Sequence, residues 1–175
     1  MAEMGTEQTD SPLPLPAFTN NPHGDALNEG AWKSRPPYSI QSHNEFGPVK
    51  WRARCKCGRV SYAIKRYRPL NAKFCHCRGC QVMHGAPFQW AAIFQKQDIS
   101  FTNGSNGLSF YSAAQNSRNY STPTKVSCEF CRTPIMDEGR NMCLIFPELI
   151  EFHGSQDEKR RQREVFHPTY VYYPQ

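Results

Sequence analysis

The chain has 175 residues, of which 38% are hydrophobic, and a formal net charge of +6 at pH 7. This length is enough for one domain with a hydrophobic core and too short for two of ordinary size. The longest uninterrupted apolar run covers five residues, 90–94, whereas a membrane-spanning helix needs about 20. The first residues also lack the basic and apolar regions of a secretory signal. We therefore expect a protein of the cytoplasm, or of the nucleus, with no membrane association.

Proline is concentrated at the beginning of the chain. Residues 1–48 hold seven of the fourteen prolines, among many Asn, Gly and Ser residues. This composition is typical of a segment that forms no core of its own. We predict a Pro-rich extension over residues 1–48, partly disordered, followed by one folded domain over residues 49–175. Trp32 and Tyr38 carry enough apolar surface for residues 30–48 to lie against that domain as an arm.

Short strands dominate the expected fold. Val60, Tyr62 and Ile64 alternate with small or polar residues, which is the two-residue period of a strand. Further strands are expected over residues 72–76, 88–94, 99–101, 108–111, 125–128 and 142–146, between turns rich in Gly and Pro. No segment shows a sustained apolar repeat of 3.6 residues, and the charged residues 157–163 suit either a short surface helix or a solvated loop. The predicted fold class is all-β.

Seven of the eight cysteines fall in three tight groups. The groups are the pair Cys55 and Cys57, the trio Cys75, Cys77 and Cys80, and the pair Cys128 and Cys131. Clustered cysteines in a reducing compartment indicate metal binding rather than disulfides. Cys143 stands alone, as a core cysteine does, and we expect it to pack in the interior.

The spacing of the groups predicts two kinds of metal site. In a strand, residues two apart point to the same face, so the first pair can offer two sulfurs to one ion. The CxxC pair curls so that its sulfurs converge, and together the two pairs make the closed Cys₄ set of a structural zinc. The trio leaves one position open, as catalytic zinc sites do. Three alternatives remain at the trio, namely closure by Cys143, closure by His84, and a redox pair formed by Cys77 and Cys80.

The donor set at the trio favours one class of chemistry. Three thiolates donate electron density to zinc and make it a weak activator of water, whereas zinc readily stabilises an added thiol as its thiolate. A thiolate held beside a carbonyl can add to it, and the reverse step releases the thiol. The sequence therefore predicts thiol addition and elimination rather than hydrolysis.

The basic residues are concentrated near the first two cysteine groups. Residues 50–80 contain ten Lys or Arg and no Asp or Glu. Such a stretch can bind nucleic acid. It can also balance the thiolates, because a Cys₄ zinc site carries −2 and a Cys₃ site −1, which lowers the formal charge from +6 to +3. Attraction of a small anionic substrate is a third explanation.

The motifs together closely resemble one family, that of the glutathione-dependent formaldehyde-activating enzymes, which includes centromere protein V. The residues that carry the resemblance are Cys55-Lys-Cys57-Gly58-Arg-Val60, Phe74-Cys75-His76-Cys77-Arg-Gly-Cys80, Gly85-Ala86-Pro87-Phe88 and Cys128-Glu-Phe-Cys131. It covers roughly residues 50–150, and the run from His84 to Phe94 looks like the fungal members. The resemblance implies a β-tent fold of short antiparallel strands held together by zinc. It also implies a structural zinc on the two pairs and a catalytic zinc on the trio, two zinc ions per chain.

The resemblance further implies an activity and a set of site residues. The family's named activity is a carbon–sulfur lyase step that joins glutathione and formaldehyde as S-hydroxymethylglutathione. His76 and His84 would then be the nearest candidates for proton transfer, and Lys73 or Arg78 could pair with a carboxylate of glutathione. The loop after the trio would border the substrate, and its residues are Gly85, Ala86, Pro87, Phe88 and Gln89.

Two other functions stay open at this point. In the first, the same zinc site acts on a different specialised metabolite by addition, elimination or rearrangement. In the second, the domain is a non-catalytic module that binds nucleic acid or protein through its basic face. If the protein is an enzyme, its expected partner is a small thiol or carbonyl compound.

Overall fold

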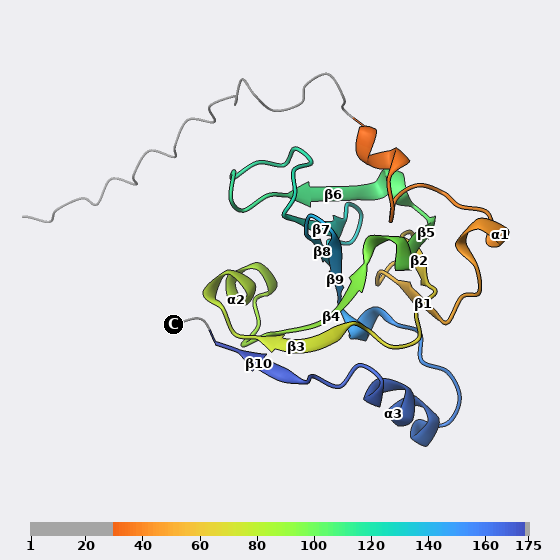
Figure 1. The fold of residues 1–175 in the computed structure, drawn as a ribbon. Coiled ribbons are helices and arrows are strands. Elements are labelled where there is room, and N and C mark those ends of the chain that lie inside the picture. Colours follow the sequence, from red (N-terminus) through yellow and green to blue (C-terminus); the bar gives the residue numbers. More distant parts are fainter. Residues whose placement is uncertain (1–29, 174–175) are drawn as a thin grey trace, which may run out of the picture.

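A computed structural model of the chain describes residues 30–173, and residues 1–29 and 174–175 lie outside the described part. The predicted disorder at the start of the extension therefore falls outside the described residues. Within them, the strands form two sheets that share one hydrophobic core (Figure 1). No helix in this part of the chain is long and apolar enough to cross a membrane.

The smaller sheet has three antiparallel strands in the order β1-β2-β5. These are β1 (Trp51–Arg54), β2 (Ser61–Ile64) and β5 (Ile99–Asn103). The larger sheet has seven strands in the order β10-β3-β4-β9-β8-β7-β6. They are β3 (Asn71–Cys75), β4 (Gln89–Gln95), β6 (Leu108–Tyr111), β7 (Thr124–Cys128), β8 (Pro134–Glu138), β9 (Met142–Ile145) and β10 (Tyr170–Tyr172).

The expected fold class of short antiparallel strands is confirmed. Every predicted strand is present, with its ends shifted by no more than two residues. The pairing of β10 with β3 is parallel, and it joins the end of the described chain to the edge of the larger sheet. Strands β1, β8 and β10 were not predicted, because none combines a clear two-residue alternation with good strand formers throughout.

The structure contains three α-helices, although no segment of the sequence shows the apolar repeat of a helix. They are α1 (His43–Phe46), α2 (Arg78–His84) and α3 (Gln156–Glu164). The charged residues 157–163, whose sequence suits either a helix or a loop, belong to helix α3. It starts with a capping box, in which Ser155 accepts from the backbone of Glu158 while the Glu158 side chain accepts from the backbone of Ser155. Such short helices are stabilised at their ends, so an apolar repeat does not reveal them.

Four short 3₁₀ helices complete the described elements. They cover Ala31–Ser34, Lys96–Asp98, Ser105–Gly107 and Pro147–Leu149.

The core lies between the two sheets and is built mainly from the inward faces of their strands. Tyr62, Phe94 and Phe166 are among its largest fully buried side chains. Strand β7 shows the alternation directly, with Thr124, Val126 and Cys128 buried. Cys143 on β9 is also completely buried within this core, as its isolated position in the sequence predicts.

Residues 30–48 pack against the core through aromatic side chains. The ring of Trp32 lies 4.9 Å from that of Tyr38 and 4.7 Å from that of Phe110. The Tyr38 hydroxyl donates a 2.7 Å hydrogen bond to the buried carboxylate of Glu138. Glu138 also accepts from Lys96 at 2.6 Å and from the hydroxyl of Tyr120 at 2.7 Å. A single buried carboxylate thus anchors the segment before β1 to the larger sheet.

Replacing Tyr38 by Phe removes that anchoring hydrogen bond and leaves the aromatic packing in place. We expect the free energy of unfolding to fall by about 1.5–3 kcal/mol, the usual contribution of a hydrogen bond to a charged group. Ile40→Ala is the matched control, because Ile40 belongs to the same segment and is 84% exposed. Equilibrium unfolding in urea measures both variants, and equal stability of Tyr38→Phe and wild type would contradict the anchoring role.

Candidate metal and thiol site

Two turns in different sheets bring the outer cysteine pairs together. Cys55 and Cys57 lie in the turn between β1 and β2, and Cys128 and Cys131 lie at the end of β7 and in the turn that follows. All four sulfurs lie within 4.8 Å of one another. The backbone N–H of Val60 donates to Cys55 Sγ at 3.3 Å, which holds that sulfur inward.

The geometry of this group fits a tetrahedral metal ion. Four sulfurs at about 2.3 Å from a central zinc would be about 3.8 Å from one another. The Sγ atoms of Cys55 and Cys57 are 3.4 Å apart, and those of Cys57 and Cys128 are 3.8 Å apart. Four thiolates at such distances favour a soft or borderline ion such as Zn²⁺ over Mg²⁺ or Ca²⁺. The predicted pairing of these two groups is therefore the arrangement found.

The sulfurs of this group differ in their ease of ionisation. A hydrogen bond from the Thr133 hydroxyl, with the oxygen 3.1 Å from the sulfur, lowers the pKa of Cys131 to about 5. Burial raises the pKa of Cys128 to about 12. A dipositive ion would remove this difference, because it stabilises all four thiolates at once.

The three cysteines of the trio lie where the chain leaves β3 and enters α2, before it returns as β4. Cys75 ends β3, Cys77 is the N-cap of α2, and Cys80 lies in the first turn of that helix. Their sulfurs also lie within 4.8 Å of one another. Among the described residues, this group includes neither His84 nor Cys143. Three sulfurs satisfy three of the four positions of a tetrahedral ion, so the donor set suits a metal with one exchangeable position.

The local environment differs between the sulfurs of the trio. Burial disfavours the thiolate of Cys77, but the backbone N–H of Cys80 and the neighbouring thiols outweigh it and lower the pKa of Cys77. Burial raises the pKa of Cys80. The positive charge of Lys125 favours ionisation of both cysteines.

A chain of polar contacts leads away from the trio. The Cys80 thiol donates to Gln89 Oε1 at 2.8 Å, and Gln89 Nε2 donates to Asp137 Oδ2 at 2.8 Å. Lys125 Nζ lies 2.6 Å from the same carboxylate oxygen. Gln89 was predicted from the sequence as a substrate-binding residue, and it is buried. Lys125 and Asp137 were missed, because no motif surrounds them. The only sequence signal is a charged residue within a mainly apolar strand.

The two predicted histidines occupy different environments. His84 ends α2, and its ring meets that of Phe146 edge-on at 5.1 Å. Burial, and then the nearby Lys125, lower the pKa of His84. The ring of His76 stacks on Tyr173 at 4.4 Å and lies 5.3 Å from Phe88. His76 is therefore packed among aromatic side chains, and its role in proton transfer stays a prediction.

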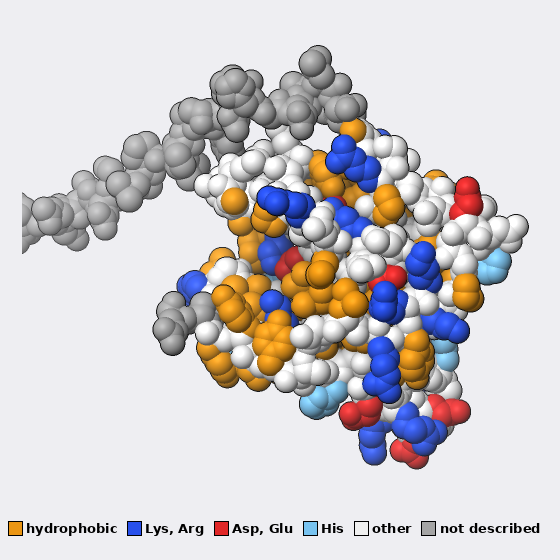
Figure 2. All heavy atoms as spheres, in the orientation of Figure 1, with side chains coloured by type: hydrophobic (Ala, Val, Ile, Leu, Met, Phe, Trp, Pro, Cys, Tyr) orange, Lys and Arg blue, Asp and Glu red, His pale blue; other side chains and the backbone are white. Residues whose placement is uncertain are grey.

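The other predicted substrate residues lie on the outer side of the trio. Lys73 Nζ lies 5.2 Å from the ring centre of Tyr172, and Arg78 is exposed at the start of α2. Residues 85–88 form the turn from α2 into β4, where Gly85 adopts a left-handed conformation with φ 58°. Figure 2 shows hydrophobic side chains gathered over α2 and the ends of β3 and β10. The exposed members of this apolar patch are Val82, Met83, Phe88, Tyr172 and Tyr173.

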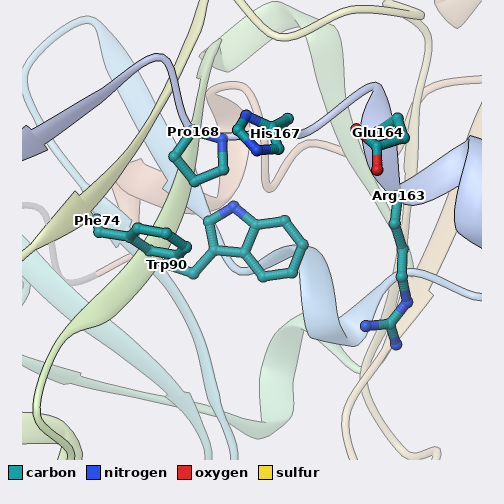
Figure 3. Close-up of a pocket in the computed structure, with 6 residues that line it drawn as sticks. All are labelled: Phe74, Trp90, Arg163, Glu164, His167 and Pro168. Atoms are coloured by element: carbon teal, nitrogen blue, oxygen red, sulfur yellow. The ribbon is translucent and has the colours of Figure 1, made fainter.

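A separate pocket lies against the larger sheet, beside the segment that follows α3. Its volume is about 190 Å³, and its walls include Phe74, Trp90 and His167 (Figure 3). Phe74 and Trp90 are paired across β3 and β4, one residue before Cys75 and one after Gln89. Because neighbouring strand residues point to opposite faces, this pocket and the trio lie on opposite sides of the sheet.

Comparison with known proteins identifies the class of protein. The family model of the glutathione-dependent formaldehyde-activating enzyme matches residues 50–169. A search of curated proteins finds no significant match. A crystal structure of a Rhodobacter sphaeroides protein is similar at 17% sequence identity, covering 69% of this chain and 99% of that chain with a TM-score of 0.49. The match of the family model over more than half of the chain shows that the chain belongs to the glutathione-dependent formaldehyde-activating enzyme family.

The buried position of Cys143 leads to a prediction about metal content. Cys143→Ala should leave the number of bound metal ions per chain unchanged, because this thiol lies in the hydrophobic core and in neither cysteine group. Elemental analysis of the purified variant and of wild type measures the ratio. Loss of one metal equivalent, with the fold intact by circular dichroism, would place Cys143 among the ligands after all.

Proposed function

We propose that this protein is a zinc-dependent carbon–sulfur lyase-type enzyme. Its substrate would be the adduct of a thiol, with glutathione as the preferred thiol, and formaldehyde or another small carbonyl compound. The observation that carries this proposal is the trio of cysteines, whose three sulfurs leave one ligand position free beside a row of polar side chains. Family membership supports the same chemistry.

The two cysteine groups would hold two zinc ions per chain with different roles. The four-cysteine group is a closed donor set that joins turns of both sheets, which suits a structural ion. The three-cysteine group would hold a catalytic ion, and when bound that ion stabilises the thiolate form of the substrate's sulfur. Thiols persist in a reducing compartment, which supports a cytoplasmic or nuclear location.

The side chains around the trio would bind and orient the substrate. Lys73 and Arg78 supply positive charge on the outer side of the trio, which suits the carboxylates of glutathione. The turn formed by residues 85–88 and the buried Gln89 would line the reacting end. We further propose that the zinc domain spans residues 49–175, with residues 30–48 packed on it.

A specific observation favours a second substrate within the same class. Part of the apolar patch adjoins the trio, because Val82 and Met83 share α2 with Cys80 and Tyr172 is the strand partner of Cys75. A formaldehyde adduct offers almost no apolar surface to it. A larger and less polar carbonyl compound would bury part of this patch, at about 25 cal/mol for each Å² of apolar area. The same zinc site acting on a different specialised metabolite is therefore the alternative.

The structure weakens the main argument for nucleic-acid binding. Arg54 is paired with Glu151 at 2.7 Å, and Arg66 is paired with Asp98 at 2.7 Å. Part of the basic stretch is thus neutralised by acidic residues from distant parts of the sequence. We expect no binding of a DNA duplex at low salt. Binding that weakens with a log–log salt slope of about −0.9 per phosphate contact would favour the non-catalytic alternative.

Serine substitutions separate the proposed roles of the two cysteine groups. Cys128→Ser should unfold the domain or cost it most of its stability, because it opens the ligand set that joins the two sheets. Cys77→Ser should leave the protein folded and inactive, because that sulfur belongs to a chain reversal within one sheet. Thermal unfolding followed by circular dichroism, together with zinc content, measures both variants. Equal loss of folding in the two would show that the roles are divided wrongly.

The reaction itself can be followed by exchange spectroscopy. In a mixture of glutathione and ¹³C-formaldehyde, the zinc-loaded protein should accelerate exchange between free formaldehyde and the adduct. Cys77→Ser should be no faster than buffer, and Cys143→Ala is the matched cysteine control. Repeating the experiment with larger aldehydes tests the alternative substrate. Failure to accelerate exchange with any thiol and carbonyl pair would overturn the proposal.

A further inference from the structure

Two buried polar atoms beside the trio lack a hydrogen-bond partner. Within residues 30–173, the buried side-chain polar atoms without a partner are His84 Nε2, Asp137 Oδ1 and the Tyr62 hydroxyl. Buried polar groups are nearly always paired, because an unpaired one loses its hydration and gains nothing in return. His84 and Asp137 therefore each call for a partner.

The two atoms are chemically complementary. A neutral imidazole carries its proton on one nitrogen, and a carboxylate oxygen accepts hydrogen bonds. The His84 ring lies 5.1 Å from that of Phe146, two residues after Leu144, which is the β9 partner of Asp137. His84 and Asp137 therefore lie on the same face of the larger sheet. The negative charge of Asp137 acts to raise the pKa of His84, and the positive charge of Lys125 acts to lower it. Hydrogen bonds of this kind are often long in the absence of substrate and shorten when the site closes around it.

Asp137 is held in place by contacts that leave only one oxygen free. Lys125 and Asp137 are direct cross-strand partners in the pairing of β7 with β8. Lys125 Nζ lies 2.6 Å from Oδ2, and Gln89 Nε2 donates to the same oxygen at 2.8 Å. Two donors on Oδ2 fix the plane of the carboxylate, and Oδ1 remains available to a third donor.

We propose that Asp137 and His84 form a carboxylate–imidazole pair, in which Asp137 Oδ1 accepts the Nε2 proton of His84. This contact fixes the tautomer of the ring and leaves Nδ1 as the nitrogen that exchanges a proton with the substrate. Asp137 is a positioning residue for His84, and Lys125 is a positioning residue for Asp137. The identity of the substrate, a thiol adduct of a carbonyl compound, rests on the proposed function.

The proton transfers balance over one reaction. In the addition direction, Nδ1 takes the proton of the thiol, and the sulfur electron pair forms the bond to the carbonyl carbon. The π pair of the carbonyl moves to its oxygen, which then takes the proton from Nδ1. The product is the hydroxyalkyl thioether, and elimination follows the same steps in reverse. His84 is neutral at the start and at the end, in agreement with its lowered pKa.

The tautomer of His84 can be measured directly in the zinc-loaded full-length protein. With ¹⁵N-labelled histidine, we expect two-bond ¹H–¹⁵N correlations to show His84 mainly as the Nε2–H tautomer. Asp137→Asn should convert it to a mixture, because the amide would use its oxygen for Lys125 and Gln89 and turn its NH₂ toward His84. Asp137→Glu should restore part of the wild-type population. Glu148→Gln is the control, since Glu148 pairs with Arg163 at the surface.

The same spectra give a second readout with a definite sign. The charged or titratable groups that face His84 are Asp137 and Lys125, and its own helix carries Arg78 and Cys80. Asp137→Asn should lower the pKa of His84, whereas Lys125→Met should raise it. In the exchange assay, His84→Gln should lower kcat by about 100-fold, within the usual range for loss of a general acid–base group, with little change in KM.

Each outcome decides between the two proposals. A wild-type His84 in the Nδ1–H tautomer, or a tautomer unchanged in folded Asp137→Asn, would overturn the pair. Should Asp137→Asn fail to fold, the wild-type tautomer and the Lys125→Met shift still decide. An Nε2–H tautomer that responds to Asp137 in a protein without exchange activity would support the pair and overturn the proposed reaction instead. Full exchange activity in His84→Gln would overturn the proton-transfer role.

Discussion

The convergence of four sulfurs from two sheets is the constraint on which the rest of this structure depends. The turn after β1 supplies Cys55 and Cys57, and the end of β7 supplies Cys128 and Cys131. These pairs lie 71 positions apart, measured from Cys57 to Cys128. Bringing such distant residues together costs chain entropy, and an ion bound by all four would offset that cost. The core residues of both sheets, Cys55 and Cys128 among them, form one hydrophobic cluster.

The trio is a separate group of cysteines from that junction. Its cysteines come from one chain reversal between β3 and β4, so their own spacing brings them close. The side chains around them do not come from that reversal. Lys125 and Asp137 belong to β7 and β8, on the far side of β9 from β4. The order of strands in the larger sheet therefore places charge beside sulfurs that are local in sequence.

Carboxylates occupy two neighbouring positions of β8, Glu138 fully buried and Asp137 partly buried, with different consequences. Glu138 has all its contacts within the protein, from Tyr38, Lys96 and Tyr120, and it anchors the segment before β1. Asp137 points to the opposite face, and one of its oxygens has no partner. A buried carboxylate whose contacts are all made within the protein stabilises the fold. A carboxylate with one unpaired oxygen near the cysteine trio can instead bind a ligand or accept a proton.

The cysteine pattern, seven of the ten described strands and the family could be predicted from the sequence. Cysteine spacing constrains which sulfurs meet an ion, and alternation of residues such as Tyr62 and Ile64 reflects a strand with one buried face. Helix α2 could not be predicted from the sequence, because it shows no apolar repeat and its N-cap is the side chain of Cys77. Only the tertiary structure placed the Lys125–Asp137 pair on the same side of the sheet as His84, since that placement results from strand order and register across the sheet. Local patterns carry information about near neighbours, and the pairing of β7 with β8 beside β9 is a property of the folded chain alone.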